Sequence, residues 1–405
     1  MTATPPEAGI CIMTETYHPV TGGGETQARA LARGLGASGV PVHMITRRSD
    51  RKLPAQEIVD GVPVYRMRPS GSGHLRKWGM VFTAFAQLVR LRTEYGVILV
   101  CGFRALGISA VLAGMLLRKP CVLKSDSQGE LSGAFFDPGL AGLHLRHDRL
   151  PVSMAVRARN ALLRRAQRFV AISSVIETEY LRNGVAAERV VRIPNSVDPA
   201  VFCPVSGTGK AALRERLGMT THDPVAVYTG RLVTGKGLQS LLRAWQEVAP
   251  AHPGALLVLV GSGGLAMQNC EDELRRFARE NGLTRSVMFT GSVDSVHEYL
   301  QAADAFVFPT EREAFGISVI EAMACGLPVV TTAVDGVRDV VRPGVDALVV
   351  PPGDDQALAA AIRRAFEAAG DRSTMGAAAR QRVLERYAAD RVVAAYRELL
   401  AGVRR

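Results

Sequence analysis

Short apolar runs alternate with amphipathic stretches along nearly the whole chain, and this alternation limits the folds that the sequence can adopt. In the first half, strand-like runs occur at 9–14, 40–46 and 97–102. Between the first two lies a stretch, 25–39, whose apolar residues recur at helical spacing: Ala28, Leu31, Ala32 and Leu35. Such alternation is typical of parallel strands that helices bury on both faces. The sequence therefore predicts a doubly wound α/β fold.

The same alternation restarts after residue 198. A segment rich in Pro, Gly and Ser, 189–210, is predicted to be a strand followed by a linker. Further apolar runs follow at 224–230, 255–261, 286–291, 305–310, 328–334 and 347–352. The 405 residues are about twice a usual domain. We therefore expect two doubly wound domains, 1–197 and 198–385, and a C-terminal helix, 386–405, that packs back on the first. Ligands bind such sheets at the carboxyl ends of the strands.

The net charge of +11 is confined to the first half of the chain. Residues 1–200 contain 26 Lys and Arg against 15 Asp and Glu, whereas residues 201–405 contain 23 of each. Such asymmetry concerns binding partners rather than the fold. An anionic acceptor, a membrane surface or a nucleic acid could each account for it.

Composition and the chain start predict a cytoplasmic protein, with peripheral contact at the inner face of the cell membrane as one option. The six cysteines form no Cys-x-x-Cys pair and are expected to be buried free thiols. The first residues lack the basic end and long apolar run of a signal peptide. The longest apolar stretch, Ala105–Leu117, is too short to cross a bilayer.

Two cations follow the predicted strand at 224–230. Arg231 and Lys236 stand five residues apart in a glycine-containing loop that opens a helix. Cations and free backbone N–H groups at the carboxyl end of a parallel strand form a phosphate site. Two exposed charges in a surface loop are the alternative that this motif alone leaves open.

Glycines follow the next strands. Gly261-x-Gly263-x-x-Ala266 resembles a dinucleotide fingerprint, but no acid stands at the tip of the next strand to bind a ribose. We interpret these glycines as positions where the backbone approaches a mononucleotide. The next strand ends in "GSV" (291–293), which would face the base.

Two glutamates, Glu313 and Glu321, flank a predicted helix start in the stretch "EREAFGISVIEAMACGLPVV" (311–330). The turn Gly316–Ser318 would present free N–H groups to a phosphate. Glu321 lies about one turn deeper, where it can accept hydrogen bonds from ribose hydroxyls. Glu313 can accept them from whatever lies beyond the phosphates. A capping role for Glu321 and a solvated Glu313 are the structural alternative.

The segments 169–198, 230–238, 257–264 and 311–332 resemble the retaining glycosyltransferases of family 4, which have the GT-B fold. The resemblance extends from about residue 9 to about 365, and the glutamate pair with seven residues between is that family's signature. It implies two Rossmann-like domains facing across a cleft, with the acceptor on the first. It also implies a UDP-sugar or GDP-sugar as donor and no further cofactor.

The resemblance also implies residue roles. Glu313 would contact donor-sugar hydroxyls and Glu321 the ribose, while Arg231 and Lys236 neutralise the diphosphate. The implied donor-binding residues are Gly23, Gly24, Arg231, Lys236, Gly263, Val293, Glu313, Phe315, Gly316, Ile317, Ser318 and Glu321. The predicted catalytic residues are Arg231, Lys236 and Glu313, which the resemblance implies, and Asp126, which stands where the family pattern differs.

The first domain departs from the family pattern at one position. Glycines 22–24 precede a predicted helix, and Gly23 and Gly24 match the family's glycine loop. Where many members carry a histidine, this chain has Asp126 beside Lys124, and an aspartate can orient or deprotonate a hydroxyl. For His18 we expect a structural role.

A basic amphipathic segment, 146–168, contains seven arginines and one aspartate. Arg157, Arg159, Arg164 and Arg165 are expected to dock an anionic acceptor or membrane, with Arg76, Lys77 and Trp78 adding to the basic surface. The alternative is a solvated helix face whose arginine stems lie on the core.

The predicted reaction is transfer of a hexose to the hydroxyl of a glycan, lipid or small molecule. No Asp-x-Asp occurs, so we expect Arg231 and Lys236 to stabilise the leaving group without a metal. A sugar-nucleotide epimerase, a phosphorylase and a nicotinamide dehydrogenase are rival enzymes. A nucleic-acid-binding function is supported only by the positive charge. Bases stack on aromatic side chains, and aromatic residues make up 6% of the chain.

Overall fold

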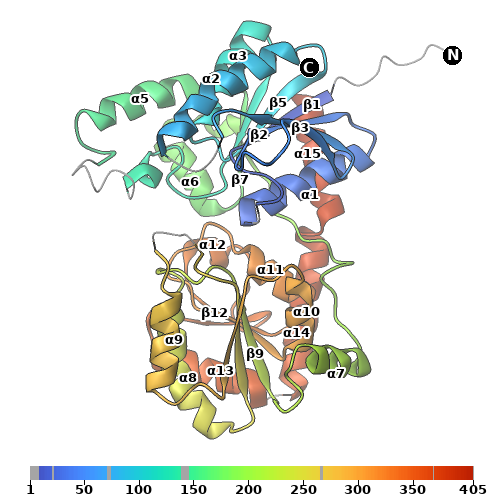
Figure 1. The fold of residues 1–405 in the computed structure, drawn as a ribbon, viewed down its shortest axis with the longest axis vertical. Coiled ribbons are helices and arrows are strands. Elements are labelled where there is room, and N and C mark those ends of the chain that lie inside the picture. The colour runs from blue at the N-terminus through green and yellow to red at the C-terminus, as the bar shows by residue number, and fades with distance from the viewer. Residues whose placement is uncertain are drawn as a thin grey trace, which may run out of the picture. The chain divides into compact units, whose positions relative to one another are not determined.

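The computed structural model describes residues 9–20, 22–70, 74–137, 146–264, 268–367 and 369–404, with the backbone alone for 74–78, 367 and 369–372. The chain forms two compact units, each built on its own sheet (Figure 1). Unit 1 comprises the described residues up to Asn195 and the C-terminal segment from Ala389; unit 2 comprises Ser196–Ala388. The doubly wound α/β fold predicted from the alternation of apolar runs is confirmed.

Unit 1 has an eight-stranded sheet in the order β3-β4-β2-β1-β5-β6-β7-β8. Every neighbouring pair is parallel except β3 and β4. The strands are β1 Gly9–Thr14, β2 Val42–Arg47, β3 Gln56–Val59, β4 Val62–Met67, β5 Tyr95–Cys101, β6 Cys121–Lys124, β7 Arg168–Ala171 and β8 Val190–Arg192. The helices are α1 Gly23–Ala37, α2 His74–Arg90, α3 Leu106–Leu117, α5 Val152–Leu163, α6 Ser174–Arg182 and α15 Ala389–Gly402.

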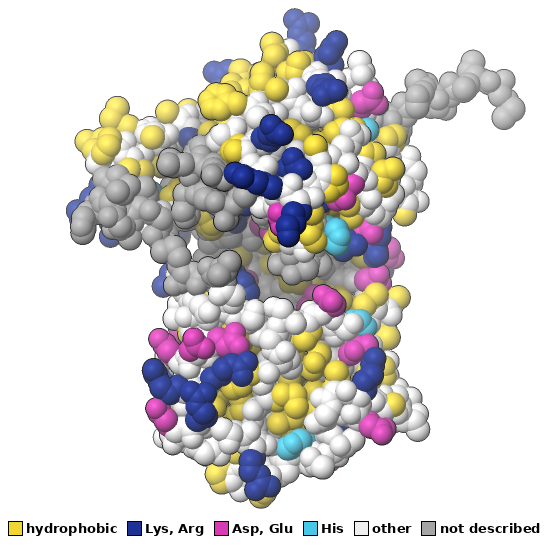
Figure 2. All heavy atoms as spheres, viewed as in Figure 1, with side chains coloured by type: hydrophobic (Ala, Val, Ile, Leu, Met, Phe, Trp, Pro, Cys, Tyr) yellow, Lys and Arg dark blue, Asp and Glu magenta, His cyan; other side chains and the backbone are white. Residues whose placement is uncertain are grey.

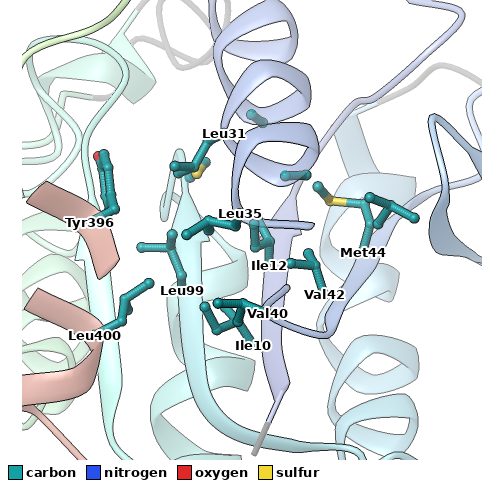
Figure 3. Packing of buried hydrophobic residues seen from close by; sticks show 14 of the residues in the cluster. Ile10, Ile12, Leu31, Leu35, Val40, Val42, Met44, Leu99, Tyr396 and Leu400 are labelled. Atoms are coloured by element: carbon teal, nitrogen blue, oxygen red, sulfur yellow. The ribbon is translucent and has the colours of Figure 1, made fainter. Parts of the chain in front are cut away.

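The core of unit 1 joins the first strand to the last helix. Ile10 and Ile12 of β1 pack with Leu35 of α1 and with Tyr396 and Leu400 of α15 (Figure 3). Burying each such side chain contributes about 1.5–3 kcal/mol. The alternate residues of β1 are buried too, so helices cover both faces of the strand.

Helix α15 lies close against α1. Val392, Tyr396 and Leu400 recur every four residues and are all buried, so one face of the helix is apolar. A Cβ added at Gly34 of α1 would come within 2.5 Å of Val393 Cγ2. The close approach of the two helices therefore depends on a residue without a side chain at position 34.

Unit 2 has a six-stranded, wholly parallel sheet in the order β11-β10-β9-β12-β13-β14. The strands are β9 Val225–Thr229, β10 Leu256–Val260, β11 Val287–Gly291, β12 Ala305–Phe308, β13 Val329–Thr332 and β14 Ala347–Val350. The helices are α7 Gly207–Arg216, α8 Leu238–Ala251, α9 Glu271–Glu280, α10 Val296–Ala302, α11 Ile317–Ala324, α12 Asp335–Arg338, α13 Asp355–Glu367 and α14 Ala369–Arg386. Every residue of β9, β10, β12 and β13 is buried, as expected of strands covered on both faces.

The structure corrects three local predictions. Helix α7 begins at Gly207, inside the expected linker, because the Ser206 hydroxyl caps it by accepting from Gly209 N at 3.2 Å. The hairpin of β3 and β4 was missed because apolar character does not follow burial there: Ile58 is exposed and Arg66 is buried. Helix α1 begins at Gly23, so Gly23 and Gly24 form its first turn instead of preceding it.

All six cysteines are free thiols, five of them buried. Among the described residues, no helix has the length and apolar character needed to cross a bilayer.

Candidate active site

In unit 2 the loops that follow β9 and β12 are bonded to each other at the carboxyl edge of the sheet. Glu311 N donates to Gly235 O at 3.0 Å. Gly237 has a positive φ of 67°, and a Cβ there would lie 1.8 Å from Pro309 O. Only glycine allows this approach. The loop that carries Lys236 is therefore held against the loop that carries Glu313.

Lys236 and Glu313 form an ion pair with Nζ and Oε2 2.8 Å apart. Glu313 Oε1 also accepts from Ala314 N at 3.0 Å, and Lys236 Nζ lies 5.5 Å from the centre of the Phe308 ring. Both side chains are about four-fifths buried. The structure thus brings together two residues that lie 77 positions apart in the sequence.

Arg231 lies between β9 and α8, as Lys236 does, and its side chain is exposed. Its carbonyl accepts from the Tyr228 hydroxyl at 3.1 Å, and within the described ranges its guanidinium has no hydrogen bond or ion pair. Burial raises the pKa of Tyr228, Glu313 raises it further and Arg231 opposes the rise. The guanidinium and the Glu313 carboxylate therefore both act on the same buried hydroxyl.

Helix α11 begins at this edge. Gly316 caps it with a φ of 99°, and Val319 N and Ile320 N both donate to Gly316 O. The N–H groups of Ile317 and Ser318, in the first turn, have no partner within the helix. The predicted phosphate-binding turn is thus the start of a helix of eight residues.

Glu321 lies one turn into α11 and is half-buried. Its carboxyl has no hydrogen-bond partner among the residues that the structure describes. Burial raises the pKa of Glu321 to about 8. A carboxyl left without partners in this way can serve a ligand hydroxyl.

The neighbouring strands β10 and β11 end beside one another. Gly261 N donates to Gly291 O at 3.0 Å, but Gly263 N donates to Glu271 Oε2 at 3.0 Å. A Cβ at Gly263 would lie 1.7 Å from Asn269 Oδ1, so loop packing by itself requires this glycine. Val293 is half-buried at the same edge, and Ala266 lies outside the described residues.

In unit 1 the structure brings Gly24 to Asp126. A Cβ at Gly24 would lie 3.2 Å from Asp126 Oδ2, and one at Gly102 would lie equally close. Asp126 forms an ion pair with the buried Lys124. His18 is half-buried, and its carbonyl accepts from Arg66 Nη2 at 2.5 Å.

Sequence reasoning missed Glu130, which organises the same loop. Its Oε1 accepts from the backbone N–H groups of Asp126 and Ser127, each at 3.2 Å. Burial raises the pKa of Glu130, and the Arg104 guanidinium, 3.5 Å away, opposes the rise. The sequence did contain a signal for this role. In "SDSQGE" (125–130), Glu130 follows the end of a strand by a few residues, so its carboxylate can accept from the backbone N–H groups of the same turn.

The prediction that Arg159 docks a partner is wrong. Arg159 is buried, and its guanidinium donates to Arg104 O at 3.0 Å and Glu130 O at 2.7 Å. Burial lowers the pKa of Arg159 to about 10. Arg157, Arg164 and Arg165 are exposed, whereas the side chains of Arg76, Lys77 and Trp78 lie outside the described residues.

Comparison with known families assigns both units. The model described as "Glycosyl transferase 4-like domain" matches residues 22–196, and that described as "Glycosyl transferases group 1" matches residues 209–382. Together they cover most of the chain. The chain belongs to the group 1 glycosyltransferases, family 4, and is a glycosyltransferase that depends on a nucleotide sugar.

Two relatives match along most of the chain, and a third matches about half of it. The "Uncharacterized glycosyltransferase MJ1607" of Methanocaldococcus jannaschii is 28% identical over 95% of each chain. A "D-inositol 3-phosphate glycosyltransferase" of Acidothermus cellulolyticus is 27% identical over 85% of this chain and 78% of that one. Over about half of each chain, a GDP-mannose-dependent mannosyltransferase of Corynebacterium glutamicum, which acts on a phosphatidylinositol monomannoside, is 34% identical.

Solved structures share the fold. The Anabaena protein HepE, in complex with UDP and glucose, aligns with a TM-score of 0.77 over 98% of this chain and all of that one, at 22% identity. Sucrose-phosphate synthase of Thermosynechococcus elongatus aligns with the same score over 97% of this chain and all of that one, at 25% identity. The GT-B fold is thereby confirmed.

Proposed function

We propose that the protein transfers a hexose from a UDP-sugar or GDP-sugar to an acceptor hydroxyl, with retention of anomeric configuration and without a metal ion. The observation that carries the proposal is the Lys236–Glu313 pair at 2.8 Å, with the exposed guanidinium of Arg231, unpaired among the described residues, between the same strand and helix as Lys236. Cations and a helix start at one sheet edge suit a diphosphate, and the carboxylate suits a sugar.

Each group has a role in this proposal. Arg231, Lys236 and the N–H groups of Ile317 and Ser318 bind the diphosphate, with Gly316 and Phe315 shaping the turn. Glu313 accepts from donor-sugar hydroxyls. The remaining contacts are those of Glu321 with the ribose, of Val293 with the base, and of Gly263, Gly23 and Gly24 through close backbone approach.

The proposed reaction proceeds on one face of the sugar. The acceptor oxygen bonds to the anomeric carbon as the bond from that carbon to the diphosphate oxygen breaks. The acceptor proton passes to the departing phosphate oxygen, so no enzymic nucleophile is needed. Arg231 and Lys236 stabilise the developing negative charge, and Asp126 orients the acceptor hydroxyl.

We infer that the acceptor is anionic or is presented at an anionic membrane, and that unit 1 binds it. Two of the relatives act, by their names, on acceptors that carry phosphate. Helix α3 packs against α2 and α5, and these helices and the residues just before α5 carry exposed apolar side chains beside arginines. The exposed apolar and basic residues on and next to these helices include Phe82, Leu112, Met115, Leu116, Leu150, Met154, Arg157, Arg164 and Arg165. Figure 2 shows hydrophobic and basic side chains together over this part of unit 1.

A thermal-shift panel of nucleoside diphosphates and their sugars tests the donor assignment. We expect UDP or GDP and one of its sugars to raise Tm, whereas unrelated nucleotides do not. The stabilising sugar nucleotide is then incubated with candidate acceptors, and NMR of the product gives the anomeric configuration. Inversion, or stabilisation by none of the compounds, would contradict the proposal.

A further inference from the structure

Two arginines follow neighbouring strands of the unit 1 sheet at its carboxyl edge. Arg47 of β2 is in register with Met67 of β4, so Arg48 and Arg68 are the first residues beyond the two strands. Arg48 N donates to Met67 O at 2.9 Å, which ties the two strand ends together. This is the edge at which doubly wound sheets bind ligands.

A hollow of about 740 Å³ opens between these strand ends and helix α2. It is lined by three arginines together with proline, serine and threonine, and no described acid is among its lining residues: Arg48, Arg51, Arg68, Pro69, Ser70 and Thr83. Figure 2 shows Lys and Arg side chains gathered over the part of unit 1 that carries β2 and β3. We call this feature the arginine hollow.

The Arg48 guanidinium is held in place by its own loop. Its Nε donates to Leu53 O at 2.6 Å and its Nη2 to Arg51 O at 2.9 Å. The turn thus closes around a fixed cation whose other N–H groups remain available. A guanidinium oriented before binding loses less conformational entropy when a ligand arrives.

Arg51 and Arg68 are exposed, and among the described residues neither has a carboxylate partner. The acids nearby are engaged elsewhere. Glu57 pairs with Arg66 at 2.5 Å, and Asp50 Oδ1 accepts from Lys52 N at 2.9 Å. Three like charges therefore line one hollow without a direct carboxylate partner among the described residues, and an anion there would reduce their mutual repulsion.

We propose that the arginine hollow binds a phosphate-type anionic group carried by the acceptor. Guanidinium groups bind phosphate through paired hydrogen bonds, which suits a hollow lined by three of them. The inference rests on the proposed function, because it takes unit 1 as the acceptor-binding unit. It deepens that function by naming the group that the acceptor carries.

The sheet order sets the size of that acceptor. Three to four strand spacings separate the hollow, at β4 and β2, from Asp126 at the end of β6. At about 4.8 Å a spacing, the distance is roughly 15–20 Å. The acceptor phosphate is therefore remote from the reacting hydroxyl, as in a phosphorylated oligosaccharide or a glycan on a phospholipid, rather than in a monosaccharide phosphate.

Chemical modification of the whole protein tests the hollow directly. Phenylglyoxal reacts with accessible arginines, and peptide mass spectrometry reads each site. We expect inorganic phosphate to slow modification of Arg51 and Arg68 at least threefold, while Arg90 and Arg182, also exposed and in unit 1, react as before. Equal protection of all four arginines, or of none, would overturn the proposal.

A pair of matched variants extends the test. R51E/R68E and R90E/R182E make the same change in net charge within the same unit. We expect R51E/R68E alone to weaken inorganic phosphate binding at least tenfold by calorimetry. Wild-type affinity in R51E/R68E would sink the idea. Retention in both variants of the thermal shift caused by the nucleoside diphosphate that stabilises the wild type shows that they are folded.

Two further measurements distinguish a lipid headgroup from a soluble phosphate ester as the source of the phosphate. Sedimentation with phosphatidylcholine vesicles, with and without phosphatidylglycerol, measures headgroup binding. Loss of vesicle binding in R51E/R68E alone assigns a lipid headgroup, whereas unchanged vesicle binding with lost phosphate binding assigns a soluble phosphate ester. If neither UDP nor GDP binds the wild-type protein while phosphate still protects Arg51 and Arg68, the proposed function fails and the anion site stands.

Discussion

The two units share a doubly wound parallel sheet but differ in charge and surface. Unit 1 contains 30 Lys and Arg against 16 Asp and Glu, whereas unit 2 contains 19 against 22. Most of the large apolar side chains exposed in the described residues belong to unit 1, and only Val201 and Val345 belong to unit 2. The same architecture therefore presents two different surfaces, because the loops and outer helix faces are free to vary while the buried strands are not.

The carboxyl edges of the sheets show the same contrast at close range. In unit 2, Lys236 is paired with Glu313 beside a helix start. In unit 1, Arg51 and Arg68 have no carboxylate partner among the described residues. A paired edge can hold a ligand with both acidic and hydroxyl parts, such as a sugar nucleotide. An unpaired basic edge is suited to an anion.

Removal of either cation of unit 2 should have the largest effect. Arg231→Ala and Lys236→Ala should each lower kcat by about 10²- to 10³-fold, because the leaving diphosphate loses its counter-charge. Steady-state kinetics measure this, with Tm as the check on folding. Arg312→Ala, an exposed arginine in the same loop region, is the matched control and should stay near wild type.

The metal-free mechanism is checked on the same variants. Activity of the wild-type enzyme should survive a chelator such as EDTA, while the two variants stay impaired. If magnesium or manganese is needed to restore activity after chelation, then Arg231 and Lys236 do not suffice to stabilise the leaving diphosphate, and the metal-free mechanism is wrong.

Removal of the Glu321 carboxyl, which has no hydrogen-bond partner in the described part of unit 2, should have the next largest effect. Glu321→Ala should weaken nucleotide-sugar binding by about 2 kcal/mol, because the ribose hydroxyls lose a hydrogen-bond partner and are left unsatisfied at a partly buried site. Calorimetry with the stabilising sugar nucleotide measures it. An unchanged Kd in a folded variant would remove the ribose assignment, and phosphate binding to unit 1 should not change in either case.

Raising the salt concentration should weaken binding to unit 1 more than binding to unit 2, by a smaller factor than the substitutions above. Exposed charges are screened beyond about 8 Å at physiological salt, so acceptor KM or vesicle binding should worsen several-fold as salt rises, and donor binding less. Charge reversal of Arg157, Arg164 and Arg165 should reproduce the loss. Reversal of Arg276, Arg279 and Arg285, exposed on unit 2, is the matched control. Equal losses in the two triple variants would mean that the charge of unit 1 only solubilises the protein.

The smallest effect concerns stability. Burial raises the folded-state pKa of Glu321 to about 8, above its unfolded value, so the folded state binds the extra proton between those values. Stability is therefore lost as pH rises through that window. Glu321→Gln should raise Tm by a few degrees at pH 8 and by less at pH 5. A gain that is independent of pH would show that the carboxyl is well hydrated.

Sequence reasoning predicted the elements that periodicity encodes. Strand β1 was expected at 9–14 and is found there. Sequence reasoning failed where the alternation of apolar and polar residues does not match burial, as in the β3–β4 hairpin, where Ile58 is exposed and Arg66 is buried. It also failed at Arg159, because the residues that bury this arginine, Arg104 and Glu130, lie 55 and 29 positions away.

By itself the sequence determined the doubly wound class, the two sheets, and the local pattern of Arg231, Lys236, Glu313 and Glu321 that marks the family. These follow from spacing along the chain, where helix and strand periods act over a few residues. Tertiary structure alone decided that Lys236 pairs with Glu313, that Arg159 is buried, and that Arg48, Arg51 and Arg68 line one hollow. Each depends on the register and order of strands, since residues that are far apart in the sequence meet only when a sheet aligns their strand ends.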